Sequence, residues 1–190
     1  MKINSISLIS LVSTLACASV ANATTLTDFY IGGMVGVGGQ TVFNDKDRVS
    51  STSTILGAIA GMDIPVFRIE GEYNYINSQD FDTNSVMVNA YLKVPSTVIL
   101  PYIGVGIGTV FGGKNIVTDS STLLQTRYDI KSTAAYQGMI GATVDVFAIP
   151  FKIDVEGRVL YAPDIYKETA TNIMPDLLEY NARVKLRYIF

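Results

Sequence analysis

Apolar and polar residues alternate at every second position in several segments of this sequence. The alternation is clearest over residues 67–75, 151–161 and 180–190, where one set of positions is aliphatic, aromatic or glycine and the other is mostly charged or amide. Ile189 departs from the pattern in the last segment. A period of two matches the side chains of a β-strand, whereas a helix, with a period of 3.6, would scatter the two sets around its axis. The pattern predicts three amphipathic strands.

Five further segments repeat the alternation less strictly and raise the number of predicted strands to eight. Most are close to the length of about 9 to 11 residues that a tilted strand needs to cross the hydrocarbon of a membrane. The five segments are residues 29–43, 55–62, 85–94, 102–111 and 133–146.

The connections between the predicted strands alternate in length. The short connections, each containing a proline, are residues 63–66, 95–100 and 145–150. The long connections are residues 44–54, 76–84, 112–131 and 162–179. Short turns at one end and long loops at the other are typical of outer-membrane barrels. We therefore expect an all-β fold, an eight-stranded antiparallel up-and-down transmembrane β-barrel, with its loops extracellular and both termini periplasmic.

Alternation alone does not decide whether the apolar face points into a soluble core or outward to lipid. The main alternative is a secreted lipocalin-like barrel. In residues 151–161 and 180–190, however, aromatic residues stand at both ends of the apolar face with aliphatic residues between them, as expected for girdles at two membrane interfaces. We therefore expect outer-membrane lipid to surround the barrel.

The chain ends on an apolar aromatic residue that continues this alternation. Val184, Leu186, Tyr188 and Phe190 share one face. The pattern resembles the C-terminal signal by which outer-membrane barrels are recognised for assembly. The expected partners are therefore the barrel assembly machinery and periplasmic chaperones.

The N-terminus has the features of a secretory signal peptide. Lys2 precedes an apolar run over residues 6–16, and Ala21 and Ala23 supply a small-x-small cleavage pattern. We expect residues 1–23 to be removed, leaving residues 24–190 as a single barrel domain. A membrane-anchoring helix is the alternative, but it needs about 20 apolar residues. A lipoprotein signal at Cys17 is a weaker alternative, because the residue three positions before it is a threonine.

If the apolar face meets lipid, the charged residues of the strands point into the barrel. Eight strands leave an interior that side chains can fill, so these charges are expected to pair with one another, with a narrow ion path as the alternative. The predicted lumen charges, seven bases and four acids, are Arg68, Glu70, Glu72, Lys93, Lys152, Asp154, Glu156, Arg158, Arg183, Lys185 and Arg187.

A specific register is predicted for the hairpin formed by the last two strands. It sets Glu156 opposite Lys185 and Asp154 opposite Arg187, which would form two cross-strand ion pairs. The same register sets two arginines opposite each other, so an acid from residues 67–75 is expected to reach across the lumen toward them.

Composition argues against several classes of function. The chain has no histidine, its one cysteine is Cys17, and its net charge is −3 with no basic stripe. We therefore expect no enzyme, no cofactor, no metal site and no nucleic-acid partner. The glycines of residues 102–108 follow a GxGxG spacing, which fits small lumen positions on a strand better than a phosphate-binding loop.

Five strand motifs follow one another along the chain: FYIGG at residues 29–33, FRIEGEY at 67–73, VMVNAY at 86–91, PYIGVGIG at 101–108 and AYQGMIG at 135–141. Taken together, these motifs resemble the surface-antigen branch of the OmpA/Opa-like barrels, which is known from obligate intracellular bacteria. The resemblance implies a surface antigen or adhesin whose loops contact host or environmental ligands, or alternatively a narrow porin-like channel. It implies no site residues, because binding in that family lies in variable loops.

Overall fold

The computed structural model describes residues 27–43, 48–78, 82–94, 99–112, 114–118, 125–129, 132–145, 149–163, 165 and 176–190. The predicted signal peptide lies outside these residues, so its removal stays a prediction. In the part of the chain that the structure describes, no helix is long and apolar enough to cross a membrane.

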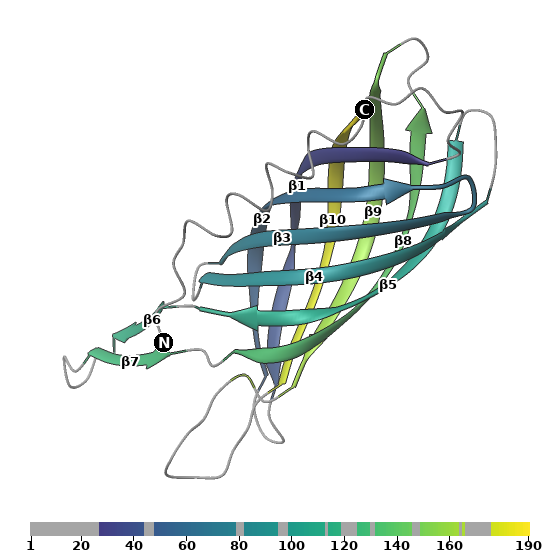
Figure 1. The fold of residues 1–190 in the computed structure, drawn as a ribbon. Helices are drawn as coiled ribbons and strands as arrows, with labels where there is room; N and C mark the ends of the chain where they lie inside the picture. The colour runs from purple at the N-terminus through teal and green to yellow at the C-terminus, as the bar shows by residue number, and fades with distance from the viewer. Residues whose placement is uncertain are drawn as a thin grey trace, which may run out of the picture.

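Eight strands close into one antiparallel barrel, as predicted (Figure 1). The barrel strands are β1 (Asp28–Phe43), β2 (Arg48–Asp63), β3 (Phe67–Ser78), β4 (Asp82–Lys93), β5 (Ile99–Phe111), β8 (Thr133–Asp145), β9 (Phe151–Ala162) and β10 (Asp176–Ile189). Their order around the barrel is β1-β10-β9-β8-β5-β4-β3-β2, and β1 also pairs with β2. Closure pairs the backbone groups that an open sheet edge would leave unpaired in hydrocarbon.

Several strands are longer than the alternation predicts. β2 begins at Arg48 rather than at residue 55, and β4 begins at Asp82 rather than at residue 85. The connections that precede them are therefore only residues 44–47 and 79–81. The prediction of four long connections is wrong for these two.

Polar side chains support strand pairing beyond the apolar band, which explains this difference. Ser78 Oγ donates a hydrogen bond to Ser51 Oγ at 2.8 Å, which joins β3 to β2. Between β3 and β4, Tyr75 Oη donates to Asp82 at 3.1 Å and Asn77 Nδ2 donates to Asp82 at 2.8 Å. Hydrophobic alternation marks the part of a strand that faces lipid, but backbone pairing does not depend on it.

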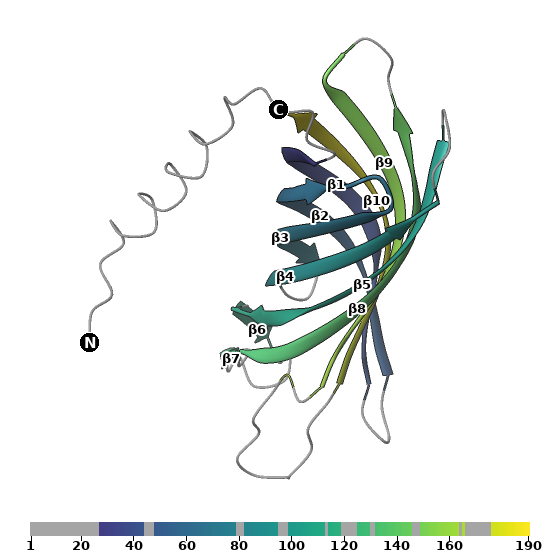
Figure 2. The ribbon, with the colours of Figure 1, turned by 45° about the vertical axis from the view of Figure 1, so that its right-hand side comes forward.

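The connection between β5 and β8, predicted as a loop over residues 112–131, contains a hairpin of β6 (Lys114–Thr118) and β7 (Gln125–Asp129). Val110 pairs with Thr133 and Lys114 pairs with Asp129, so the register of the β5–β8 ladder continues into the hairpin. Gly112 lies at the junction with a φ of 62°, in the left-handed region that favours glycine. Figures 1 and 2 show the hairpin projecting beyond the barrel strands.

The outer surface of the barrel is apolar and its interior is polar. Val105 and Ile140 are each 68% exposed, whereas Arg183 is 1% exposed and Glu70 is fully buried. This arrangement is the reverse of a lipocalin-like soluble barrel and confirms that the apolar face points outward.

Exposed aromatic side chains gather near both ends of the outer surface. We call the end that carries connections 64–66, 94–98 and 146–150 the turn end, and the opposite end the loop end. The turn-end set is Phe29, Phe67, Tyr188 and Phe190, and the loop-end set is Tyr73, Tyr75, Tyr136, Tyr161 and Tyr180.

The spacing of these two girdles matches a membrane. A strand that rises about 3.3 Å per residue and tilts by about 40° covers about 25 Å of height between Phe151 and Tyr161, which is the usual height of the apolar band of such barrels. Tyr188 packs edge-on against Phe151 and against Phe190, with ring centroids 5.3 Å apart in both pairs.

Two glycine substitutions test the close packing of this sheet. A Cβ atom at Gly108 would overlap the carbonyl oxygen of Val86, whereas a Cβ atom at Gly138, on the outer face, would meet no atom within 4 Å. We expect Gly108→Ala to lower the free energy of unfolding by about 1–3 kcal/mol and Gly138→Ala to change it by less than about 0.5 kcal/mol. Urea unfolding in detergent micelles measures both, and equal effects of the two variants would contradict this packing.

Candidate functional site

The charged interior is built around Glu72, a fully buried residue of β3. Arg183 of β10 donates two hydrogen bonds to its carboxylate, at 2.7 and 2.9 Å. Arg158 of β9 donates to the same carboxylate at 3.3 Å, and Asn89 donates to it at 2.8 Å. One acid of β3 therefore lies against the two arginines, which is the contact across the lumen expected from the sequence.

A second group lies next to Glu72 and extends the network toward the turn end. Lys185 Nζ lies 2.7 Å from a carboxylate oxygen of Glu70 and 3.1 Å from one of Glu156. Tyr30 and Tyr91 also donate hydrogen bonds to Glu70, at 2.7 and 2.9 Å. Each carboxylate here accepts from more than one donor, as buried charges require.

A third group fills the turn end. Arg187 lies between Asp63 and Asp154 and donates to each at 2.9 Å. Arg68 pairs with Asp154 at 3.0 Å, and Lys93 pairs with Asp63. The structure thus joins most of the predicted lumen charges into two sets of ion pairs, one in the middle of the barrel and one at the turn end.

Arg68 also stacks on two aromatic rings. Its guanidinium carbon lies 4.0 Å from the ring centroid of Tyr91 and 4.6 Å from that of Tyr102. These distances are in the range of cation–π attraction. The free-energy cost of burying the Arg68 charge is therefore offset by the faces of these two rings as well as by the carboxylate of Asp154.

The buried charges are balanced. Sequence reasoning missed two acids, Asp63 and Glu179, because the predicted strands ended just short of them. Lys152 is not part of the buried set: its side chain is 20% exposed and lies at the turn-end rim, with Nζ 3.9 Å from both Asp28 and Asp145. Among the described residues the buried acids are Asp63, Glu70, Glu72, Asp154, Glu156 and Glu179, and the buried bases are Arg68, Lys93, Arg158, Arg183, Lys185 and Arg187.

The predicted register of the β9–β10 hairpin is wrong by two residues. Glu156 lies opposite Arg183, not opposite Lys185, and Asp154 lies opposite Lys185. A shift of two keeps every side chain on the same face, so alternation could not distinguish the two registers. The expected ion pairs still form, but on the diagonal, as the Lys185–Glu156 distance of 3.1 Å shows.

The same shift separates the two arginines that were expected to face each other. Arg158 lies opposite Asn181 rather than opposite Arg183. Arg158 then reaches Glu179 at 2.5 Å, while Arg183 reaches Glu156. Each arginine thus has its own carboxylate in addition to Glu72.

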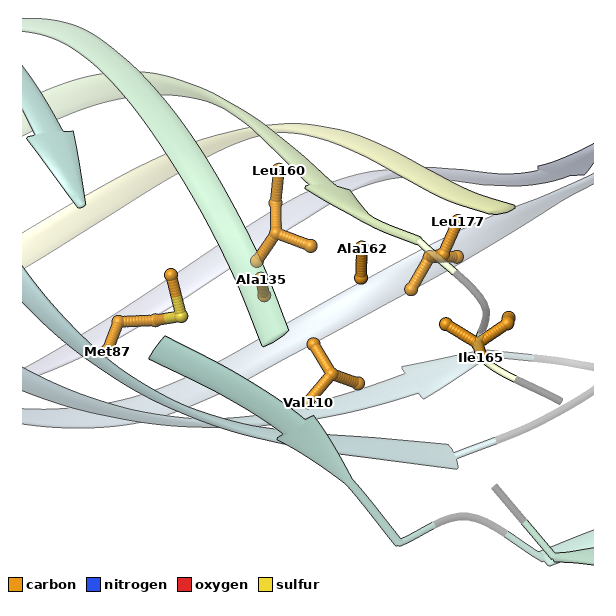
Figure 3. Packing of buried hydrophobic residues seen from close by; sticks show 7 residues of the cluster. All are labelled: Met87, Val110, Ala135, Leu160, Ala162, Ile165 and Leu177. Carbon is orange, nitrogen blue, oxygen red and sulfur yellow. The ribbon is translucent and has the colours of Figure 1, made fainter. Parts of the chain in front are cut away.

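At the loop end the interior becomes apolar along part of its wall. A buried cluster there joins residues of β4, β5, β8, β9 and β10 with Ile165, which comes from the β9–β10 connection (Figure 3). Sequence reasoning assigned polar residues to the lumen and did not predict this cluster. Its members are Met87, Val110, Ala135, Leu160, Ala162, Ile165 and Leu177.

The residues of the predicted C-terminal assembly signal lie on the outer surface. Val184, Leu186, Tyr188 and Phe190 are all exposed. The backbone N–H of Phe190 donates to the carbonyl of Phe29 at 2.9 Å, so the chain end is held against the first strand. Recognition of this segment by assembly factors stays a prediction.

The described residues offer few sites for other chemistry. Among them, no group of three or more aspartate, glutamate, histidine or cysteine residues could hold a metal ion. Two hollows, of ≈ 670 and ≈ 590 Å³, lie on the outer, apolar surface, where Val37 and Ala182 contribute to both.

Comparison with known proteins identifies the family. The family model described as the outer membrane protein beta-barrel domain matches residues 8–190. The chain belongs to this outer-membrane barrel family. Membership agrees with the apolar outer band and places the barrel in the lipid of the outer membrane. No curated protein matches the sequence.

Solved structures show the same fold at low sequence identity. Neisserial surface protein A is 14% identical with a TM-score of 0.58, over 83% of this chain and 95% of that one. The N-terminal β-barrel domain of OprF from Pseudomonas aeruginosa is 14% identical with a TM-score of 0.53, over 85% and 97%. Ail, the attachment invasion locus protein of Yersinia pestis, is 11% identical with a TM-score of 0.48, over 85% and 99%. At these identities the likeness to the first two concerns the fold alone, and no argument rests on the third.

The central position of Glu72 leads to a stability prediction. Glu72→Ala removes the carboxylate that Arg158 and Arg183 share and leaves these buried charges without a full opposite charge. We expect it to lower the free energy of unfolding by about 3–5 kcal/mol. We expect a lower urea midpoint and a lower temperature at which the compact band is lost on gels. Lys152→Ala, at the exposed rim, is the control and should cost less than about 1 kcal/mol. If the control cost as much as the Glu72 variant, the network would not be the source of stability.

Proposed function

We propose that this protein is a non-enzymatic surface protein that exposes its loop end outside the cell and contacts host or environmental ligands, or antibodies, through the connections there. The turn end and both termini lie in the periplasm in this proposal, and outer-membrane lipid covers the apolar band. The barrel assembly machinery and periplasmic chaperones are its proposed partners during biogenesis.

The observation that carries the proposal is the filled, neutral interior. Six buried acids and six buried bases of the described chain pair with one another, and an apolar cluster occupies part of the loop end. A lumen occupied in this way argues against a channel, because an ion would have to displace charges that already satisfy one another. The barrel then acts as a membrane anchor, and the connections are the part of the protein left to carry a further function.

The interior also offers little for catalysis. The sequence has no histidine. Glu72 already accepts hydrogen bonds from Arg158, Arg183 and Asn89, so its oxygens are not available to take a proton from a substrate. This supports a non-enzymatic role.

Two connections supply most of the surface proposed to bind ligands. Connections 44–47 and 79–81 are short, whereas residues 112–132 include the projecting hairpin and residues 163–175 join β9 to β10. The hairpin extends the β5–β8 ladder in register, so it presents two paired strands beyond the barrel. We therefore assign ligand contact mainly to these two connections.

Protease treatment of intact cells tests the orientation. We expect proteinase K to cleave within residues 112–132 and 163–175 in intact cells, and within residues 94–98 and 146–150 only after the outer membrane is made permeable. Mass spectrometry of the fragments locates the cuts. Cleavage at the turn end of intact cells would reverse the proposed orientation.

Planar bilayers and cell binding test the function itself. We expect purified protein to give no reproducible conductance steps, because the interior is filled. Replacing Lys114–Asp129 by a short glycine–serine linker should reduce binding to host cells while the barrel still folds, since β5 and β8 keep their own ladder. Stable conductance together with unchanged cell binding would favour the narrow channel.

A further inference from the structure

The larger of the two hollows on the outer surface is a groove lined by two rows of outward side chains. Its volume of ≈ 670 Å³ is within the range of small-molecule sites. The members of each row come from β3, β2 and β1 and lie opposite one another in the ladders. One row is Asn77, Thr54 and Val37, and the other is Tyr75, Leu56 and Val35. We call this feature the outer groove.

The outer groove descends from the loop end toward the middle of the membrane. The second row continues through Val184 to Val155 of β9. Tyr75 lies eight positions from Phe67, where β3 begins at the turn end, whereas Val155 lies four positions from Phe151, where β9 begins. Four residues of a strand that rises about 3.3 Å per residue and tilts by about 40° cover about 10 Å of height. Half of the hydrocarbon core is about 15 Å thick, so the outer groove covers most of one leaflet.

Polar side chains line the outer groove on β2 and β3, and aliphatic side chains line it on β1, β10 and β9. At the β3 end, Tyr75 Oη donates a hydrogen bond to Asp82 at 3.1 Å, and Asn77 Nδ2 donates to the same carboxylate at 2.8 Å. Arg183 contributes only from the lumen side, because it is 1% exposed. The outer groove is therefore amphipathic along its length, with its polar end at the loop end.

Asp82 gives this polar end a negative charge. Within the described part of the chain its two donors, Tyr75 and Asn77, are neutral, and no lysine or arginine pairs with it. A carboxylate has about four lone-pair sites, so that of Asp82 can accept from a further donor. Hydrogen bonds from a cationic donor to a carboxylate are the stronger ones, whereas an anionic group at the same place is repelled.

We propose that the outer groove binds one acyl chain of a membrane lipid whose headgroup carries an ammonium group. The chain lies against Val35 and Val184, and the ammonium group meets the carboxylate of Asp82 at the loop end. Contact on both sides of the chain together with this charge holds the lipid longer than the lipids around it.

A lipid fits the outer groove better than a second copy of the barrel does. The groove is continuous with the apolar band that already faces lipid, and a flexible chain can follow its slope across β2, β1 and β10. A second barrel is rigid and would need a ridge of matching slope. Its own Asp82 would also add a second negative charge to an isologous contact at this height.

Lipid retention by the intact protein tests the proposed site. Val35→Trp places a large ring between the two rows, and we expect it to retain about tenfold less phosphatidylethanolamine than the wild type. Val88→Trp is the matched control, because Val35 and Val88 are both 58% exposed and Val88 lines neither hollow. Mass spectrometry of the protein released from nanodiscs counts the lipids that stay attached. Equal retention by the two variants would overturn the proposal.

Two lipids with the same acyl chains test the headgroup. We expect phosphatidylethanolamine, which carries an ammonium group, to be retained about threefold more than phosphatidylglycerol, which carries none, as one exposed ion pair would give. Asp82→Asn removes the charge and should abolish this preference while the barrel still folds. If the wild type retains both lipids equally, or Asp82→Asn keeps the preference, the ammonium assignment is wrong.

The same spectra distinguish a lipid from a second copy of the chain. We expect the wild type to carry the mass of one barrel plus lipid. A mass of two barrels in the wild type and in Val88→Trp, with one barrel in Val35→Trp, would identify a second copy in the outer groove and reject the lipid.

Discussion

The absence of water in hydrocarbon is the constraint on which the rest of this structure depends. Backbone groups in lipid need partners, so the sheet closes, and its apolar side chains face outward. Charged side chains within the apolar band are then confined to a narrow lumen, where they are stable only beside an opposite charge. Glu72, held by Arg158 and Arg183, shows how one carboxylate from β3 satisfies bases of two strands on another part of the wall.

This constraint also gives the barrel and its connections different roles in the proposed function. Ion pairs run from the turn end through the middle of the barrel, and apolar packing around Leu160 and Ile165 continues to the loop end. Such an interior stabilises the barrel, and in the proposed function the connections carry the binding.

The sequence predicted that the candidate site consists of charged residues in the lumen, but it did not predict all of its members. Alternation placed most of the lumen charges correctly, yet it ended the strands before Asp63 and Glu179 and so left an apparent excess of bases. With these two acids added and Lys152 removed, the buried set has six acids and six bases. Neutrality of a closed lumen is therefore a signal that sequence reasoning could have used. Lys152 is the opposite error: it lies on the polar face and was predicted in the lumen, but its side chain is at the exposed rim.

The local pattern of this sequence by itself determined the strands, their two faces and the class of fold, because alternation with a period of two and lipid on one side permit few other arrangements. Register, strand length beyond the apolar band and the β6–β7 hairpin were decided by tertiary structure. A two-residue shift of β10 against β9 leaves the alternation unchanged. Choosing between such registers requires side chains from distant strands, such as Glu72 and Arg183, to meet across the lumen.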